Sequence, residues 1–210
     1  MREHRIFASV YDLMLRGTER GGLRDMRAEL LSEAGGRTLE LGAGTGLNLA
    51  HYTGAVTELV LTEPDPHMAR RLRRRLQDDP PAPARVEVVE APAERLPFED
   101  GSFDSVVSTL VLCSVEAPAA ATGEIARVLK PDGQLLYLEH VRADDDGLAR
   151  WQDRLERPWG WLGAGCHPNR DTVAQLQAAG LETESLVRDR MPKAPPIVRP
   201  VVRGRARPSR

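Results

Sequence analysis

The chain has 210 residues, a length at which a single folded domain with a full hydrophobic core is expected. Its 41% hydrophobic and 29% charged residues are typical of a soluble globular protein, and a net charge of −2 argues against a general nucleic-acid-binding protein. No apolar run approaches the ~20 residues that cross a bilayer, and residues 1–5 are charged with no apolar segment behind them, so neither an integral membrane segment nor a signal peptide is expected.

Strand and helix signals alternate along the chain. Seven segments have the pattern of short strands, and they are residues 38–41, 58–62, 85–89, 103–112, 134–141, 181–187 and 197–202. Segments with apolar residues at helical spacing lie before and between them, and they are residues 6–15, 23–31, 47–52, 66–76, 117–129, 148–157 and 169–179. This alternation predicts an α/β fold, a seven-stranded and mostly parallel sheet with helices on both faces.

Local signals predict where several elements begin and end. Pro66 suits the first turn of its helix, and Asn169 is expected to cap the helix that follows it. Residues 130–133, with the sequence KPDG, are expected to form a turn. Pro200 restricts the last predicted strand to an edge of the sheet or to a break.

A glycine-rich turn between the first predicted strand and the next helix is the strongest functional signal. Gly42, Gly44 and Gly46 lack a Cβ atom and tolerate positive φ, so their backbone can approach a ligand closely. A dinucleotide fingerprint would need its last glycine where Leu47 stands, which argues against a nucleotide-binding dehydrogenase. On its own, the turn is also compatible with a purely structural role.

An acidic residue follows the second predicted strand, where open α/β sheets bind ligands. Glu63 lies about twenty residues after the glycines, and its carboxylate can accept hydrogen bonds from both hydroxyls of a ribose. The alternative is an acid at the N-terminus of the next helix, with Asp65 as its cap.

Four strings of sequence carry a family resemblance. They are E-x-G-x-G-x-G from Glu40, A-E-x-L-P-F from Ala93, D-G-S-F-D-S-V from Asp100 and R-V-L-K-P-D-G from Arg127. In combination they resemble the class I S-adenosylmethionine (SAM) methyltransferases of the ubiquinone/menaquinone-biosynthesis type, over residues 38–140. The resemblance implies a Rossmann-like fold, SAM as cofactor and S-adenosylhomocysteine as product.

The same resemblance implies a role for each matching residue. The glycines would face the methionine part of SAM, Glu63 would bind its ribose, Ala93 and Glu94 would lie beside the adenine, and Thr109 would line the methyl-donor end. The cofactor-binding residues expected in this way are Glu40, Gly42, Ala43, Gly44, Gly46, Asn48, Glu63, Pro64, Ala93, Glu94 and Thr109.

A narrower resemblance concerns the methyl acceptor. The strings TLVLCSV from Thr109 and LEHV from Leu138, with shorter matches at 151–152, 158–159, 165–166 and 198–200, look like the methyltransferase-like branch that contains alkyl-thiol S-methyltransferases. Animal members of that branch begin with a hydrophobic membrane-associating segment, which is not expected here. The resemblance implies a small, apolar acceptor, with thiol sulfur favoured.

A thiol acceptor makes a modest demand on catalysis, because a few per cent of it is already thiolate near neutral pH. His140, beside Glu139 at the end of a predicted strand, is the candidate catalytic base, with simple packing near the cofactor as the alternative. His167 is a weaker candidate, and Cys113 is expected to be a buried, inert thiol.

The aromatic residues have two interpretations. Trp151, Trp159 and Trp161 are candidates for one wall of an apolar acceptor pocket, with core packing as the alternative. Tyr11 is expected to pack within the N-terminal helix, and capping the pocket is its alternative role.

Other functions remain open from the sequence. One is an N- or O-methyltransferase acting on an amine, a lipid head group or a quinone-like ring. Another is a SAM-binding protein without catalysis. The acceptor is expected to be a small molecule and not a nucleic acid, no metal site is expected, and the sequence leaves the oligomeric state open.

The predicted organisation is one domain, residues 1–210, built from four segments. These are an N-terminal helical cap at 1–34, a SAM-binding core at 35–141, substrate-side and C-terminal strands at 142–203, and a basic tail at 204–210. Residues 188–210 contain eight basic residues and one acidic residue, and a solvated terminus is expected, with contact to phosphates or an anionic membrane as the alternative. Two cysteines are too few for a disulfide framework, which favours a cytoplasmic location.

Overall fold

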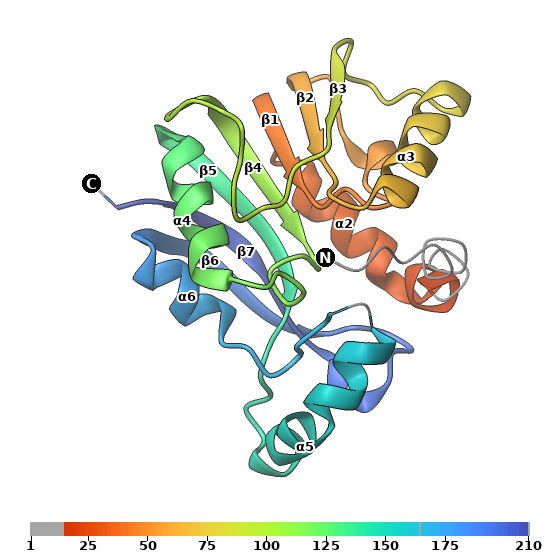
Figure 1. The fold of residues 1–210 in the computed structure, drawn as a ribbon, viewed down its shortest axis with the longest axis vertical. Helices are drawn as coiled ribbons and strands as arrows, with labels where there is room; N and C mark the ends of the chain where they lie inside the picture. The colour runs from red at the N-terminus through yellow and green to blue at the C-terminus, as the bar shows by residue number, and fades with distance from the viewer. Residues whose placement is uncertain (1–14, 164, 210) are drawn as a thin grey trace.

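The computed structural model describes residues 15–163 and 165–209, which form one seven-stranded sheet with helices around it (Figure 1). The strands are β1 (Gly36–Leu41), β2 (Val56–Thr62), β3 (Val86–Val89), β4 (Phe103–Thr109), β5 (Leu129–His140), β6 (Leu181–Arg190) and β7 (Pro200–Pro208). Their order across the sheet is β3-β2-β1-β4-β5-β7-β6. Neighbours from β3 to β5 are parallel, and β7 is antiparallel to both β5 and β6. The predicted fold class is therefore confirmed.

Helices cover both faces of the sheet, because consecutive strand residues point to opposite sides and both sides are apolar. On one face, Leu59 and Leu61 of β2 share a core with the helix α2 (Arg24–Leu31). On the other face, Val60 shares a core with α4 (Pro118–Val128) and α6 (Thr172–Ala178). The remaining helices are α3 (Pro66–Asp78), α5 (Asp146–Leu162) and the short η1 (Glu19–Leu23), η2 (Leu49–His51) and η3 (Pro196–Val198). No described helix is long and apolar enough to span a membrane.

The chain order reverses between β1 and β4, which lie side by side in the middle of the sheet. In open α/β sheets this switch point is where a crevice forms outside the carboxyl ends of the strands. The glycine-rich turn after β1 and the loop after β4 therefore lie next to each other, as the sequence predicts.

Two predicted element boundaries near the switch point are wrong. The segment after the glycine turn forms only the 3-10 helix η2 and not a helix from Leu47 to Tyr52. Strand β4 ends at Thr109 instead of Leu112, because Leu110 adopts a positive φ of 62° and turns the chain away from the sheet. Both differences leave irregular backbone at the edge where the site lies.

The C-terminal segment also differs from the prediction. Strand β7 lies between β5 and β6, and Pro200 is tolerated there because it is the first residue of the strand. Residues 204–208 belong to this strand, so they are not a basic tail. The side chains of Arg203 and Arg205 pair with Glu29 of α2 and with Glu33 just after it, so this positive charge lies in ion pairs between β7 and the α2 segment.

Two further predictions, a helix cap and a turn, are wrong. The cap of α6 is Asp171, whose carboxylate accepts from the backbone N–H of Ala174 at 3.0 Å, while Asn169 donates to Asp153. Residues 130–133 belong to β5 and not to a separate turn. Tyr11 and most of the predicted helix 6–15 lie outside the described residues.

Candidate cofactor and acceptor site

The glycine turn after β1 has a backbone that side chains would obstruct. Gly42, Gly44 and Gly46 have φ values of 52°, 59° and 84°, in the region that favours glycine. A Cβ atom on Gly42 would lie 2.9 Å from Val111 Cγ2, and one on Gly46 would lie 2.8 Å from Leu49 Cδ1. The turn is thus closely packed, while Gly42 and Gly44 stay partly exposed, which suits a bound ligand.

Glu63, at the carboxyl end of β2, is joined directly to the glycine turn. Its Oε2 accepts from the N–H of Gly44 at 2.8 Å, and its Oε1 accepts from the N–H of Asp65 at 2.8 Å. The side chain is buried, and burial raises its pKa. A carboxylate has about four acceptor positions, so two remain for a ligand such as a diol. Asp65 caps α3 by accepting from the N–H of His67 at 2.7 Å, as the alternative interpretation of this segment expects.

Glu40 is a second buried carboxylate, one strand away on β1. Asn48 donates to its Oε1 at 3.0 Å, and the Tyr52 hydroxyl donates to its Oε2 at 2.6 Å. Burial is the main cause that raises the pKa of Glu40 to about 7, although these two hydrogen bonds and the charge of Arg27 lower it. A cationic group placed beside Glu40 would favour its charged form.

Arg27 belongs to this network and was not identified from the sequence. Its Nη1 donates to Asn48 Oδ1 at 2.8 Å and to Thr109 Oγ1 at 3.2 Å, and its Nε pairs with Glu19 at 3.1 Å. Asn48 Nδ2 donates to the same Thr109 hydroxyl at 2.9 Å. The signal was present in the sequence, because Arg27 stands on the apolar stripe of α2 one turn after Leu23, where a buried cation needs a partner.

The loop after β3 is held in place by the strings that carry the family resemblance. Arg127 donates to Asp100 at 2.7 Å and to the backbone oxygens of Phe98 and Leu96 at 2.7 and 3.1 Å. It also pairs with Glu124 at 2.7 Å. Three of the four strings therefore meet at one guanidinium, which fixes the end of this loop where it enters β4.

The two residues expected beside the adenine have structural contacts of their own. Ala93 is buried in the core, and Glu94 accepts from the N–H groups of Glu116 and Ala117 at the start of α4, at 2.8 and 3.4 Å. Pro64 is partly exposed between Glu63 and the α3 cap. The role of these residues toward a cofactor stays a prediction.

The carboxyl end of β5 shapes the loop that follows β4. Glu139 is fully buried, and its carboxylate accepts from the Ser108 hydroxyl at 2.7 Å, from the N–H of Val111 at 3.0 Å and from the N–H of Cys113 at 3.4 Å. Burial raises its pKa. This acid therefore has a structural role, since it replaces the strand pairing that β4 loses after Thr109.

His140, the next residue, is buried and lacks a hydrogen-bond partner for Nδ1 among the described residues. Burial lowers its pKa to about 4, against the opposite effect of the backbone oxygens of Val198 and Pro200. The imidazole is therefore neutral at pH 7, with one ring nitrogen unused. A buried polar atom without a partner is costly, so this nitrogen needs a partner that the described residues do not supply.

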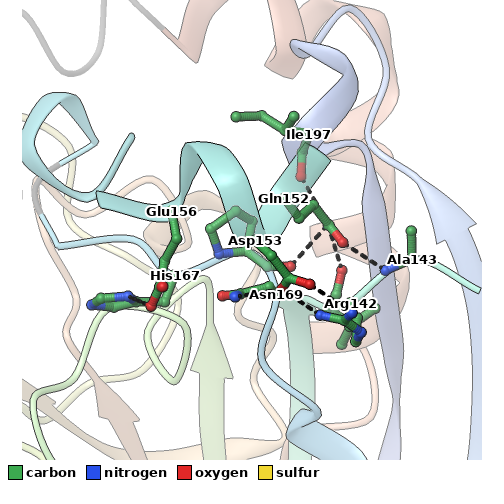
Figure 2. Close-up of polar contacts among 10 residues, drawn as sticks. Arg142, Ala143, Gln152, Asp153, Glu156, His167, Asn169 and Ile197 are labelled. Atoms are coloured by element: carbon green, nitrogen blue, oxygen red, sulfur yellow. Dashed lines mark hydrogen bonds and ion pairs between the residues drawn. The ribbon is translucent and has the colours of Figure 1, made fainter. Parts of the chain in front are cut away.

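The segment after α5 packs on the loop after β4. The N–H of His167 donates to the backbone oxygen of Cys113 at 2.7 Å, and His167 Nδ1 lies 2.9 Å from Glu156 of α5 (Figure 2). Cys166 and Cys113 are both buried free thiols, with their sulfur atoms 3.8 Å apart. The neighbouring thiol and burial raise the pKa of Cys113, so the predicted inert, buried character agrees with its surroundings.

The interpretation of the tryptophans as a pocket wall is wrong for two of them. Trp151 and Trp161 of α5 are 55% and 76% exposed and lie on the outside of the molecule. Trp159 is partly buried and packs against the core.

A parallel sheet with this strand order, a glycine turn at its switch point and a carboxylate after β2 define a Rossmann-like site for a nucleoside cofactor. The family model for the methyltransferase domain matches residues 39–137. The chain is 33% identical over 193 residues to the thiol S-methyltransferase TMT1B of Homo sapiens, which covers 88% of this chain and 79% of that protein.

Other relatives are named for different activities. The chain is 32% identical over 143 residues to a phosphatidylethanolamine N-methyltransferase of Cereibacter sphaeroides, covering 66% of this chain and 68% of that protein. A solved SAM-dependent methyltransferase from Thermotoga maritima has the same fold, with a TM-score of 0.70 and 21% identity over 97% of this chain and 99% of that one. The chain belongs to the class I SAM-dependent methyltransferases, and membership implies SAM as the methyl donor.

Proposed function

We propose that this enzyme transfers the methyl group of SAM to a small, apolar acceptor whose reacting atom is a thiol sulfur. Relatives named as thiol S-methyltransferases, 32–33% identical to this chain, support the class of acceptor. The observation that carries the proposal is the state of His140, a buried imidazole with a pKa of about 4 and an unused Nδ1.

The basicity of this imidazole favours sulfur. A base with a pKa near 4 is too weak to take a proton from an alcohol, a protonated amine or a thiol, so the acceptor has to ionise without its help. A thiol has a pKa of about 8.5 and ionises by itself to a few per cent at neutral pH. The thiol would lose its proton to water, and His140 would hydrogen-bond the acceptor sulfur and align it for transfer of the methyl group.

The residues at the switch point fit the proposed donor. Glu63 would accept hydrogen bonds from the ribose hydroxyls with its two unused acceptor positions, and the glycine turn would let backbone approach the methionine part. Thr109 would lie at the methyl-donor end, held there by Asn48 and Arg27. When bound, SAM supplies a sulfonium-activated methyl group, so the protein contributes mainly alignment and a dry site.

The charge of Glu40 is suited to the same ligand. Its carboxylate is buried with a pKa of about 7, and the ammonium and sulfonium groups of SAM are cations. We propose that Glu40 and Asn48 lie beside the methionine part, with Ala43 and Gly46 as turn backbone and with Pro64, Ala93 and Glu94 toward the adenine. Cys113 and Cys166 as free thiols support the proposal of a reducing, cytoplasmic compartment.

A parallel assay of methyl acceptors tests the proposal. The enzyme is given SAM with a small alkyl thiol, a catechol or an aminoethanol lipid, and S-adenosylhomocysteine release is measured. Product formation with the thiol alone is the expected result. The competing function, N- or O-methylation, is favoured by the phosphatidylethanolamine N-methyltransferase relative, and product only with the lipid or the catechol would establish it.

A further inference from the structure

Helix α5 is fixed to the body of the protein by its inner face. Gln152 is fully buried, and its amide nitrogen donates to the backbone oxygens of Val141, Pro168 and Ile197 at 3.1, 3.0 and 2.9 Å. Its amide oxygen accepts from the N–H of Ala143 at 2.8 Å (Figure 2). One side chain thus ties α5 to the carboxyl end of β5, where the proposed acceptor site lies.

Two acidic residues of α5 form polar contacts with the loops on this inner side. Asp153 pairs with Arg142 at 2.5 Å and accepts from Asn169 at 3.1 Å. Glu156 lies 2.9 Å from His167. Figure 2 shows these carboxylates directed at the loops that contain Arg142 and His167. Their negative charge is therefore paired within the protein.

The outer face of α5 has the opposite character. Trp151, Trp161 and Leu162 are 55%, 76% and 59% exposed, and they are three of the exposed large apolar side chains in the described structure. Trp151 and Leu162 are eleven positions apart, about three turns, so they point in nearly the same direction. Trp161 lies beside them at the end of the helix.

Arginines lie on the same outer face. The exposed arginines of this face are Arg150, Arg154 and Arg157. The guanidinium of Arg154 lies 5.9 Å from the Trp151 ring centroid, and none of the three arginines forms an ion pair within the described part of the chain. The outer face thus combines exposed indole and leucine side chains with unpaired positive charge.

We propose that the outer face of α5, formed by Trp151, Trp161, Leu162 and these arginines, docks on the surface of an anionic lipid bilayer. Tryptophan and leucine partition into the boundary between head groups and acyl chains, and arginine binds lipid phosphates bidentately. Each arginine near such a surface contributes on the order of 1 kcal/mol at physiological salt. A second copy of this chain fits less well, because two such faces would bring six arginines together.

Docking on a membrane would also affect the reaction, and this consequence rests on the proposed function. Gln152 holds α5 beside the carboxyl end of β5, so a docked α5 brings that end of the sheet close to the membrane. Apolar thiols concentrate in membranes, and the enzyme would meet them there. Binding itself does not depend on which acceptor is methylated.

Vesicle binding of the full chain tests the proposal, with tryptophan fluorescence as the readout. All three tryptophans of the chain lie in α5, so a blue shift reports on this helix alone. We expect a shift and co-sedimentation with phosphatidylcholine vesicles containing phosphatidylglycerol, weakened at high salt and absent with pure phosphatidylcholine. The same assay with Leu162→Ser and Arg154→Glu is expected to show vesicle affinity reduced at least ~10-fold for each.

Matched controls on other surfaces make the assay specific. Leu186→Ser changes a 40% exposed leucine on β6, and Arg70→Glu changes an exposed arginine on α3. Both are expected to bind vesicles like the unchanged protein, and all four variants are expected to methylate a soluble acceptor in buffer at the normal rate. The proposal is overturned if anionic vesicles do not bind, if the α5 variants bind as tightly as the controls, or if α5 instead mediates self-association that these variants abolish.

Discussion

Two buried carboxylates, Glu63 and Glu40, define the chemistry of the site at the residue scale. Glu63 accepts two backbone N–H groups and has acceptor positions to spare, whereas Glu40 accepts from two side chains within a closed network. Glu63 is therefore suited to binding neutral hydroxyl groups, whereas the protonation state of Glu40 depends on the charges near it. Their different surroundings predict different effects of the same Glu-to-Gln change.

Replacing Glu63 with glutamine is expected to weaken SAM binding by roughly 10- to 100-fold, because hydrogen bonds from the ribose hydroxyls to a carboxylate are stronger than those to an amide. Isothermal titration with SAM measures the change. Glu58→Gln is the matched control, since Glu58 lies on the same strand and forms only a half-exposed pair with Arg37. Equal affinities for both variants would remove Glu63 from the cofactor site.

Replacing Glu40 with glutamine is expected to change how stability depends on pH. The pKa of Glu40 is about 7 in the native state, against 4.5 for an unperturbed glutamate, so between these values the folded protein keeps a proton that the unfolded chain has lost. Stability therefore falls as pH rises through this window, by up to about 3 kcal/mol.

The glutamine variant cannot titrate at this position. The free energy of unfolding of both proteins is measured by urea denaturation without SAM. The value for the variant minus the value for the unchanged protein is expected to increase as pH rises from about 5 to about 8. Parallel pH curves for the two proteins would show that Glu40 is not the buried acid described above.

The proposed role of His140 predicts a specific pH–rate profile. With saturating SAM, kcat/KM for a thiol is expected to rise toward the thiol's own pKa, without a step near 6.5, because His140 with a pKa of about 4 stays neutral throughout. His140→Gln is expected to lower kcat ~10-fold and leave this profile's shape unchanged. The matched control is His67→Gln on α3, and an equal kcat for both variants would exclude His140 from the reaction.

At the scale of elements, the packing around the glycine turn restricts which residue can stand at position 46. Gly46 has a φ of 84°, and a Cβ atom there would press on both Leu49 and Leu72, which links the turn to η2 and α3. The turn therefore cannot accept a side chain without moving two core residues. Packing alone is therefore enough to require glycine at position 46, whatever the turn binds.

Gly46→Ala is expected to destabilise the protein by about 1–3 kcal/mol, from backbone strain and overpacking together. Gly54→Ala provides the control, because Gly54 has negative φ and nothing within 4 Å of its added Cβ atom. Thermal unfolding measures both, and a stable Gly46→Ala variant that still binds SAM would contradict the described packing.

Elements were predictable from the sequence where local signals and packing agree. The strands β1, β2 and β3 are short apolar runs between helices, and their existence was confirmed. Leu47 to Tyr52 has helical spacing, but Asn48 and Tyr52 turn inward to bind Glu40, which leaves only η2. Long-range contacts of this kind cannot be seen in a local pattern.

The same limit explains the errors in the site. Arg27 contributes to it from a helix 82 residues before Thr109, and only its place on an apolar stripe signals this. Trp151 and Trp161 are the type of residue that lines an apolar pocket. They lie on the exposed face of α5, because Gln152 and its contacts define the opposite face as the buried one. Composition alone does not tell which face of a helix is buried.

At the scale of the whole molecule, the fold places the candidate cofactor residues after β1, β2 and β4, and the candidate base after β5, at one edge of the sheet. The order β3-β2-β1-β4-β5 brings the glycine turn, Glu63, Thr109 and His140 to neighbouring carboxyl ends. The antiparallel pair β6 and β7 completes the sheet and takes the basic C-terminal residues into ion pairs with Glu29, Glu33 and Glu184. The fold was therefore predictable from the sequence, and the fold brings the candidate donor residues together, whereas the acceptor depends on α5 and on loops without a motif.

The most direct test of the account is methyl transfer from SAM to a small alkyl thiol, followed by the thioether product and by S-adenosylhomocysteine release. We expect that the unchanged enzyme forms both in equal amounts, that Glu63→Gln forms far less at limiting SAM, and that catechol and aminoethanol lipid give no product. Product with the catechol or the lipid, and none with any thiol, would contradict it.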